Sequence, residues 1–272
     1  MTKDWITRFA PTPNWYMHLG HILSAYFVWG IAHIVGAKVI LRIEDHDKSR
    51  AKPEYTNAIL SDLEWLGLHP DIVTQQSLHL DRFESILNQL ADRDLVYACA
   101  CSRTDIQARN PGSSVSYDNY CRDRNLEFAG KGLRLRMTEG PDELIRDRNS
   151  NYTYMFANVV DDVHDGVNLI VRGNDLLSSV ERQLRIRELL TNNPQPVYIH
   201  HRLIMSDDNT NQKLSKSNFD HPIQRYREQG YTPQSLLGFA AFKAGYSNQP
   251  TPLAFNDWLD SCLSRLYSNL SI

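Results

Sequence analysis

Short apolar runs alternate with segments in which apolar residues recur every three or four positions over residues 6–92. The short runs at 6–10 and 38–45 predict buried strands, the second with four aliphatic residues. Segments with helical spacing follow each run, at 21–36, 53–67 and 78–92. Gly36 suits a helix C-cap and Pro53 a first helical turn. This strand–helix alternation predicts an α/β protein with a parallel sheet.

The alternation stops between residues 98 and 152. This segment holds three of the four cysteines, many turn-forming residues and a charged, strand-like stretch, so it predicts an inserted subdomain. The alternation then resumes. We expect a strand at 167–173, an arginine-rich helix at 178–191, one or two strands at 196–205 and mostly helices afterwards.

Composition limits the class of protein. The chain has 272 residues, 42% hydrophobic and 22% charged, which is ordinary for a globular protein. The net charge of −3 argues against a broadly basic nucleic-acid binder. Any RNA contact would need a local patch, for which Arg182, Arg185 and Arg187 are candidates unless they form a solvated face. No apolar stretch has membrane-spanning length and no signal peptide is recognisable, so we expect a cytoplasmic protein.

Two segments suggest phosphate binding. His18, Gly20 and His21 stand at the start of a predicted helix, where main-chain N–H groups and the helix dipole favour anions. Gly20 lets a ligand approach the backbone. Far downstream, Lys213 and Lys216 lie in a polar loop that could close over a polyphosphate. The alternative interpretations are a helix start with incidental histidines and a solvated, charged turn.

Cys99, Cys101 and Cys121 are close together in the sequence. In a cytosolic chain such clustering favours a metal over disulfides, and three thiolates with one further ligand make a tetrahedral zinc site. Three buried free thiols are the alternative. Cys262 stands alone on a helical pattern and is predicted to belong to the core. The adjacent His200 and His201 point to opposite faces of a strand, so we interpret them as structural or near a nucleotide.

Taken together, HLGH after a first strand and KLSKS after a last strand resemble the two signatures of class I aminoacyl-tRNA synthetases. The stretches RFAPTP, LRIEDHD, LEWLGL, YMFANVVDDVHDGV and IVRGNDLL resemble, in order and spacing, the catalytic half of glutamyl-tRNA synthetases. The resemblance implies a Rossmann-like class I catalytic domain over 1–97 and 153–217. It also implies an inserted zinc-containing acceptor subdomain at 98–152 and a short helical region at 218–272.

The resemblance also implies roles for individual residues. ATP, with Mg²⁺, would be bound by His18, Gly20, His21, Lys213 and Lys216. Of these, His18, His21 and Lys216 would act catalytically by stabilising charge on the phosphates. L-Glutamate would be bound by a larger set, with Glu44 on its ammonium group and Arg172 on its side-chain carboxylate: Arg8, Thr12, Glu44, Tyr154, Asn158 and Arg172. One structural Zn²⁺ would take Tyr117 as its fourth ligand, with water or a nearby histidine as the competing choice.

The expected acceptor follows from the segment after the second signature. Residues 218–272 can form a few helices but not a large anticodon-binding domain. The chain thus resembles the truncated glutamyl-queuosine tRNA(Asp) synthetases, which implies a monomer that transfers glutamate to queuosine in the tRNA(Asp) anticodon loop. Two alternatives remain: an activating ligase with a carrier-protein, small-molecule or tRNA 3′-end acceptor, and an inactive RNA-binding paralogue. Trp15, where the family usually has glycine nearby, leaves substrate choice open.

Overall fold

A computed structural model describes residues 4–47, 51–110, 116–205 and 221–270, and the side chains of these residues up to 264. The chain divides into two compact units. Unit 1 comprises Met1–Gln76, Gly166–Ser179 and Pro194–Ile272, and unit 2 comprises Ser77–Asp165 and Val180–Asn193. No helix in the described ranges is long and apolar enough to cross a membrane.

Unit 1 is built on parallel strands, as the strand–helix alternation predicts. Strands β1, β2 and β3 pair in parallel in the order β1-β2-β3, and β7 pairs in parallel with β8. Strand β7 lies beside β1, where the Asn168 N–H donates to the Ile6 carbonyl over 3.1 Å. The bounds of the unit's elements are β1 Ile6–Phe9, α1 Leu19–Val35, β2 Lys38–Ile43, α2 Pro53–Leu66, β3 Ile72–Gln75, β7 Leu169–Gly173, η2 Asn174–Ser179, β8 Val197–His201, α7 Ile223–Glu228, α8 Pro233–Lys243 and α9 Phe255–Leu270.

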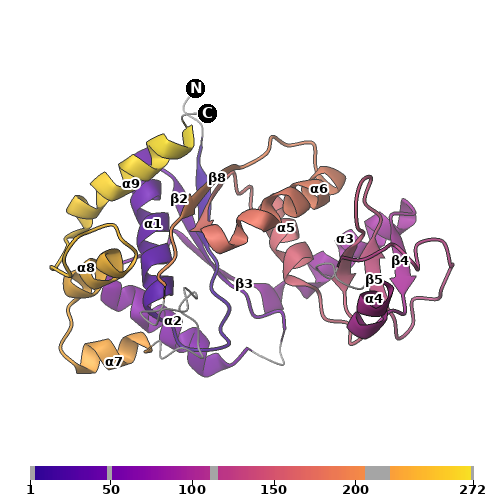
Figure 1. The fold of residues 1–272 in the computed structure, drawn as a ribbon, viewed down its shortest axis with the longest axis horizontal. Coiled ribbons are helices and arrows are strands. Elements are labelled where there is room, and N and C mark those ends of the chain that lie inside the picture. The colour runs from indigo at the N-terminus through magenta and orange to yellow at the C-terminus, as the bar shows by residue number, and fades with distance from the viewer. Residues whose placement is uncertain (1–3, 48–50, 111–115, 206–220, 271–272) are drawn as a thin grey trace. The chain divides into compact units, whose positions relative to one another are not determined.

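Helix α1 is the centre of this unit's core. Eleven of its seventeen residues are buried, because the sheet lies against it and α8 and α9 pack on it as well (Figure 1). Gly36 ends the helix with a φ of 69°, a left-handed conformation that glycine adopts at little cost. The C-terminal helices therefore belong to the core of unit 1, where Cys262 is fully buried as predicted.

Unit 2 combines an antiparallel sheet, in the order β4-β5-β6, with helices. Its bounds extend beyond the predicted insertion at 98–152, because one apolar cluster joins Phe83 of α3, Phe156 of α5 and Ile186 of α6 to the sheet. The unit's elements are α3 Leu80–Asp92, β4 Val96–Cys99, α4 Arg103–Arg109, β5 Gly132–Leu135, β6 Glu143–Arg146, α5 Tyr154–His164 and α6 Val180–Leu190, and the short η1 Gln76–Leu78 lies at the boundary with unit 1.

Candidate active site

Two histidines cap the N-terminus of α1. The Nδ1 of His18 accepts from the Gly20 N–H over 3.1 Å, and the Nδ1 of His21 accepts from the His18 N–H over 3.2 Å. Their ring centroids are 3.9 Å apart. Together they form a reciprocal capping box, a role that serine and glutamate more often take. We call His18 and His21 the histidine cap.

The histidine cap sets the protonation pattern of both rings. A nitrogen that accepts a hydrogen bond carries no proton, so in each neutral ring the proton resides on Nε2. Each ring therefore turns its Nδ1 toward the main chain and keeps Nε2–H as its donor. A Cβ added at Gly20 would lie 3.0 Å from Cε1 of His18. Gly20 thus makes room for the His18 ring, which adds to its predicted role of admitting a ligand.

The first group of predicted glutamate contacts lies at the carboxyl ends of β1 and β2. Arg8 is buried in β1, and Glu44, which is 3% exposed, follows β2 directly. The Glu44 N–H donates to the Pro11 carbonyl over 3.1 Å, which ties the two strand ends together beside Thr12. Thr12 itself is exposed. Glu44 is therefore a buried carboxylate at the end of a strand.

Arg172 lies at the end of β7 and is 5% exposed. Its register partner on β8 is His200, and the Arg172 Nε donates to the His200 Nε2 over 3.3 Å. One Nη donates to the Leu176 carbonyl over 3.1 Å, and the guanidinium carbon lies 5.2 Å from the Tyr198 ring centre. These contacts orient the guanidinium. Sequence reasoning missed His200 as its partner, although the residues occupy facing positions on neighbouring strands.

The remaining predicted substrate residues are distributed differently. Tyr154 begins α5 in unit 2 and is half-buried. Asn158, one turn later, is buried and accepts from the Gln183 amide over 3.4 Å. Lys213 and Lys216 lie outside the described residues. Trp15 is 43% exposed and packs against Tyr16 and Tyr55, with ring centres 5.9 and 5.8 Å away.

Three sulfur atoms converge in unit 2. The Sγ atoms of Cys99, Cys101 and Cys121 all lie within 4.8 Å of one another, and those of Cys101 and Cys121 are 3.5 Å apart. Tetrahedral sulfurs at 2.3 Å from a zinc ion would be about 3.8 Å apart. The Tyr117 hydroxyl oxygen lies 3.4 Å from the Cys99 Sγ and accepts from the Cys121 N–H over 2.9 Å. We call the three thiols the cysteine cluster, and its donor set fits a zinc ion.

Nearby charges act on the cysteine cluster. Burial raises the pKa of the Cys99 thiol, but hydrogen bonds to Tyr117 and Arg134 outweigh burial, and the net pKa is lowered. Burial raises the pKa of Cys101 to about 11, although Arg109 donates to its sulfur over 3.3 Å. The Arg134 guanidinium lies 3.4 Å from the Tyr117 ring centre. Sequence reasoning missed both arginines, whose roles depend on contacts distant in the chain.

The candidate RNA arginines of α6 have partners within unit 2. Arg182 makes a two-pronged ion pair with the buried Glu143, with both N–O distances 2.6 Å. Arg185 donates to the Glu139 carbonyl over 2.5 Å, and Arg187 is 6% exposed. Arg187 is thus buried and the Arg185 side chain is only 17% exposed, whereas the Arg182 side chain remains 48% exposed beside its ion pair.

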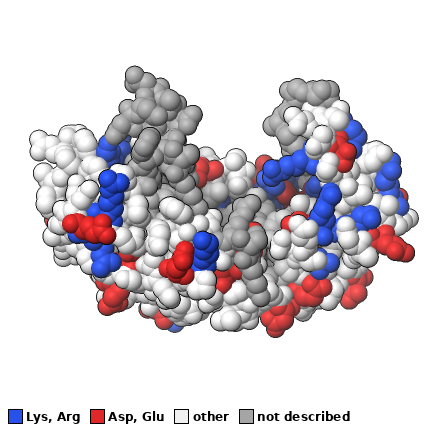
Figure 2. All heavy atoms as spheres, turned by 90° about the horizontal axis from the view of Figure 1, so that it is seen from below, with Lys and Arg blue, Asp and Glu red and all other residues white. Residues whose placement is uncertain are grey.

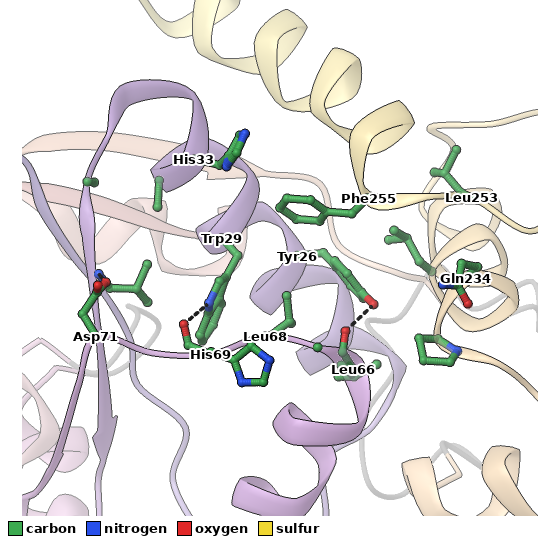
Figure 3. Close-up of a pocket in the computed structure, with 16 residues that line it drawn as sticks. Tyr26, Trp29, His33, Leu66, Leu68, His69, Asp71, Gln234, Leu253 and Phe255 are labelled. Carbon is green, nitrogen blue, oxygen red and sulfur yellow. Dashed lines mark hydrogen bonds between the residues drawn. The ribbon is translucent and has the colours of Figure 1, made fainter.

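A separate pocket of about 360 Å³ lies in unit 1, near the C-terminal end of α1 (Figure 3). Its lining includes Ala37 and Val39 at the start of β2 and Asp71 just before β3. Tyr26 and Trp29 point their polar atoms at the carbonyls of Leu66 and His69. The described lining contains none of the predicted substrate residues, and Tyr26, the first lining residue on α1, lies about 12 Å along the helix axis from His18.

Comparison with known proteins places this geometry in a family. The family described as "tRNA synthetases class I (E and Q), catalytic domain" matches residues 5–146 and 133–251. The chain belongs to this family. Its members are ligases, and the family assignment agrees with the resemblance seen in the sequence.

The class I synthetase relatives differ in how much of their length the chain covers. It is 33% identical to the glutamate–tRNA ligase of Frankia casuarinae over 85% of the chain and 54% of that protein. It is 34% identical to the glutamyl-Q tRNA(Asp) synthetase of Rhodobacter capsulatus over 85% of the chain and 98% of that protein. The chain thus spans about half the length of the matched glutamate–tRNA ligases and nearly all of the second relative.

The solved structures agree with the synthetase fold. The glutamate–tRNA ligase of Elizabethkingia meningosepticum, determined in complex with its amino acid, superimposes with a TM-score of 0.76. It is 22% identical, and the match covers 94% of this chain and 64% of that one. At this identity the likeness establishes the fold, and the chemistry depends on the residues described above.

Proposed function

We propose that the protein activates L-glutamate with ATP and transfers it to the queuosine base at the anticodon wobble position of tRNA(Asp). The observation that carries the activation step is the histidine cap, which fixes two Nε2–H donors at the N-terminus of a helix that follows the first parallel strand. A helix N-terminus with such donors suits a polyphosphate.

In the first proposed step, a glutamate α-carboxylate oxygen attacks the α-phosphorus of ATP, and pyrophosphate leaves. The histidine cap and Lys216 stabilise the negative charge that spreads over the phosphates, and Lys213 binds the departing phosphates. Mg²⁺ bound with ATP would screen the same charge. No general acid is required, because pyrophosphate leaves as an anion.

Glutamate is held at both ends in this proposal. The Glu44 carboxylate binds the substrate ammonium, and the Arg172 guanidinium grips the side-chain carboxylate through two hydrogen bonds. The burial of both residues strengthens these contacts, since water competes weakly there. Arg8 and Thr12 add contacts from β1 and the residues after it. Tyr154 and Asn158 are proposed as further contacts on the resemblance of their segment to the family.

In the second proposed step, a hydroxyl of the modified base attacks the carbonyl carbon of glutamyl-adenylate, and AMP leaves. The near-complete match to the glutamyl-Q tRNA(Asp) synthetase of Rhodobacter capsulatus supports this acceptor. An unstacked base in a loop is accessible to a pocket in a way that a stacked base is not. On the face drawn in Figure 2, basic and acidic side chains are interspersed, so we expect modest, salt-sensitive RNA affinity.

We also propose that the cysteine cluster, with Tyr117, holds one structural Zn²⁺. The sulfur separations and the Tyr117 hydroxyl oxygen 3.4 Å from the Cys99 Sγ support this. The ion would crosslink β4, the segment after it and the turn at Cys121, and would add to the small apolar cluster that Cys99 and Cys121 form with Tyr97, Ile106 and Tyr117.

Pyrophosphate exchange tests the activation step. Labelled pyrophosphate should enter ATP in the presence of glutamate, with glutamine and aspartate at least about a hundredfold less effective, because a hydrogen-bonded charge pair discriminates strongly. Equal exchange with glutamine would refute the proposed role of Arg172. Absence of exchange with every amino acid and with tRNA present would favour the inactive RNA-binding alternative.

A further inference from the structure

Helix α7 is too short to be stable by itself. It has six residues, and its N-cap, Pro222, makes no side-chain hydrogen bond. The helix must therefore be fixed by contacts with the rest of unit 1. Ile223 is fully buried in the main core, and this anchors the beginning of the helix.

The beginning of α7 is joined directly to the histidine cap. The Ile223 N–H donates to the Met17 carbonyl over 3.0 Å, and Pro222 forms an antiparallel bridge with His18. The extended backbone of His18, with φ −124° and ψ 176°, is what turns its ring onto the Gly20 N–H. A shift of α7 therefore changes the main chain that aims the His18 ring.

Two side chains of α7 bind a buried carboxylate of α2. Asp62 of α2 is 0% exposed. One of its oxygens accepts from the Gln224 amide over 3.0 Å, and the other faces the Arg227 guanidinium at 3.4 Å. The Gln224 amide oxygen has no hydrogen-bond partner in the part of the chain that is described. The orientation of Gln224 therefore depends on Asp62.

A buried carboxylate is a less favourable contact, in free energy of folding, than apolar packing at the same place would be. Burial raises the pKa of Asp62 to about 6, against the opposing effects of Arg227 and Gln224. A buried charge pair contributes little net stability, because removing the charges from water offsets their attraction. Its best-attested role is to select one way for two elements to pack together. This free-energy cost favours a role for the carboxylate beyond stability.

We propose that Asp62 is a positioning residue for the nucleotide site, acting through Gln224 and Arg227 of α7 on the main chain of Met17 and His18. This inference rests on the proposed function in assigning ATP to the histidine cap. Asp62 does not touch the substrate. It sets the register of α7 and thereby the direction of the His18 Nε2–H bond.

The experiment compares Asp62→Asn with the control variant Glu143→Gln. The control also removes one buried carboxylate charge, but in unit 2, where Glu143 pairs with Arg182. The first readout is the ¹⁵N spectrum of the imidazoles, assigned by single histidine substitutions. The second is pyrophosphate exchange, with KM for ATP, KM for glutamate and kcat measured separately.

We expect Asp62→Asn to shift the His18 ring signals and to raise KM for ATP about tenfold, with KM for glutamate unchanged within twofold, because a small misplacement weakens an aligned donor. Glu143→Gln should lower the melting temperature without either effect. Should Asp62→Asn fail to fold, Gln224→Met, at a half-buried position, gives the same test.

Unmoved His18 signals in a folded Asp62→Asn or Gln224→Met protein would overturn the proposal, whatever the enzyme's substrate. Equal changes in both KM values would also overturn it, since they would indicate a general structural effect. Shifted His18 signals in an enzyme without exchange activity would support the positioning role and refute the proposed function instead.

Discussion

The histidine cap of unit 1 and the cysteine cluster of unit 2 are both small groups of ligand-type side chains, yet they are held in different ways. In the cap, one nitrogen of each ring is engaged by the main chain of a single helix turn. In the cluster, sulfurs from Cys99 and Cys121 meet across twenty-two positions of sequence. Local main-chain hydrogen bonds therefore hold both histidines, with one added tertiary contact from α7 to His18, whereas tertiary packing or a metal must hold the cysteines.

The largest expected effect concerns the amino-acid end of unit 1. Arg172→Ala should lower kcat/KM for glutamate, because the substrate carboxylate loses its charged partner. The loss should correspond to about 2–4 kcal/mol of transition-state stabilisation. The measurement is pyrophosphate exchange with varied glutamate. Arg202→Ala, an exposed arginine just after β8, is the control and should stay within twofold. A loss of less than about fivefold for Arg172→Ala would contradict the assigned role.

The next prediction separates capping from chemistry in the histidine cap. Asparagine is a good N-cap but has no Nε2–H donor, so His18→Asn should keep the melting temperature within about 2 °C. It should lower the exchange rate about a hundredfold, as expected when one charge-stabilising donor is lost. His18→Ala should lose the cap as well and melt a few degrees lower. Full activity of the asparagine variant would show that the ring only caps the helix.

Much of unit 1 was predictable because its signals are local. Gly36, Pro53 and the apolar spacing of α1 and α2 mark element ends that the structure confirms. The bounds of unit 2 were not predictable in this way, because the packing of α3, α5 and α6 with the antiparallel sheet joins segments far apart in sequence. The same limit applied to Asp62, Gln224 and Arg227, which have no sequence motif in common and meet only in the folded chain.

The zinc content of the protein tests the cysteine cluster of unit 2. Wild-type protein purified without added metal should contain about one zinc per chain, and Cys101→Ser should contain almost none, because three ligands bind zinc far more weakly than four. The variant should also melt on the order of 5 °C lower. Cys262→Ser, which alters a buried thiol of unit 1, should retain its zinc. Wild-type protein that contains no zinc, and that melts at the same temperature with and without zinc, would reject the site.

The last expected effect is a pH dependence of stability. The pKa of Asp62 is raised to about 6 in the folded protein, so the folded state binds this proton more tightly than the unfolded state does. Its contribution to the free energy of unfolding should therefore fall as pH rises from about 4 to about 6 and then level off. The measurement is urea unfolding of wild type and Asp62→Asn across this range. The difference between them should follow that sign, and a difference independent of pH would contradict the raised pKa.

The central claim concerns the acceptor, and one RNA tests it most directly. A tRNA(Asp) anticodon stem-loop that carries queuosine but has no acceptor arm presents the modified base without a 3′-terminal acceptor. We predict that the protein attaches labelled glutamate to this stem-loop in the presence of ATP, and that the same stem-loop with guanosine in place of queuosine stays unlabelled. Labelling only of full-length tRNA with an intact 3′-terminal adenosine, whether or not queuosine is present, would contradict the account.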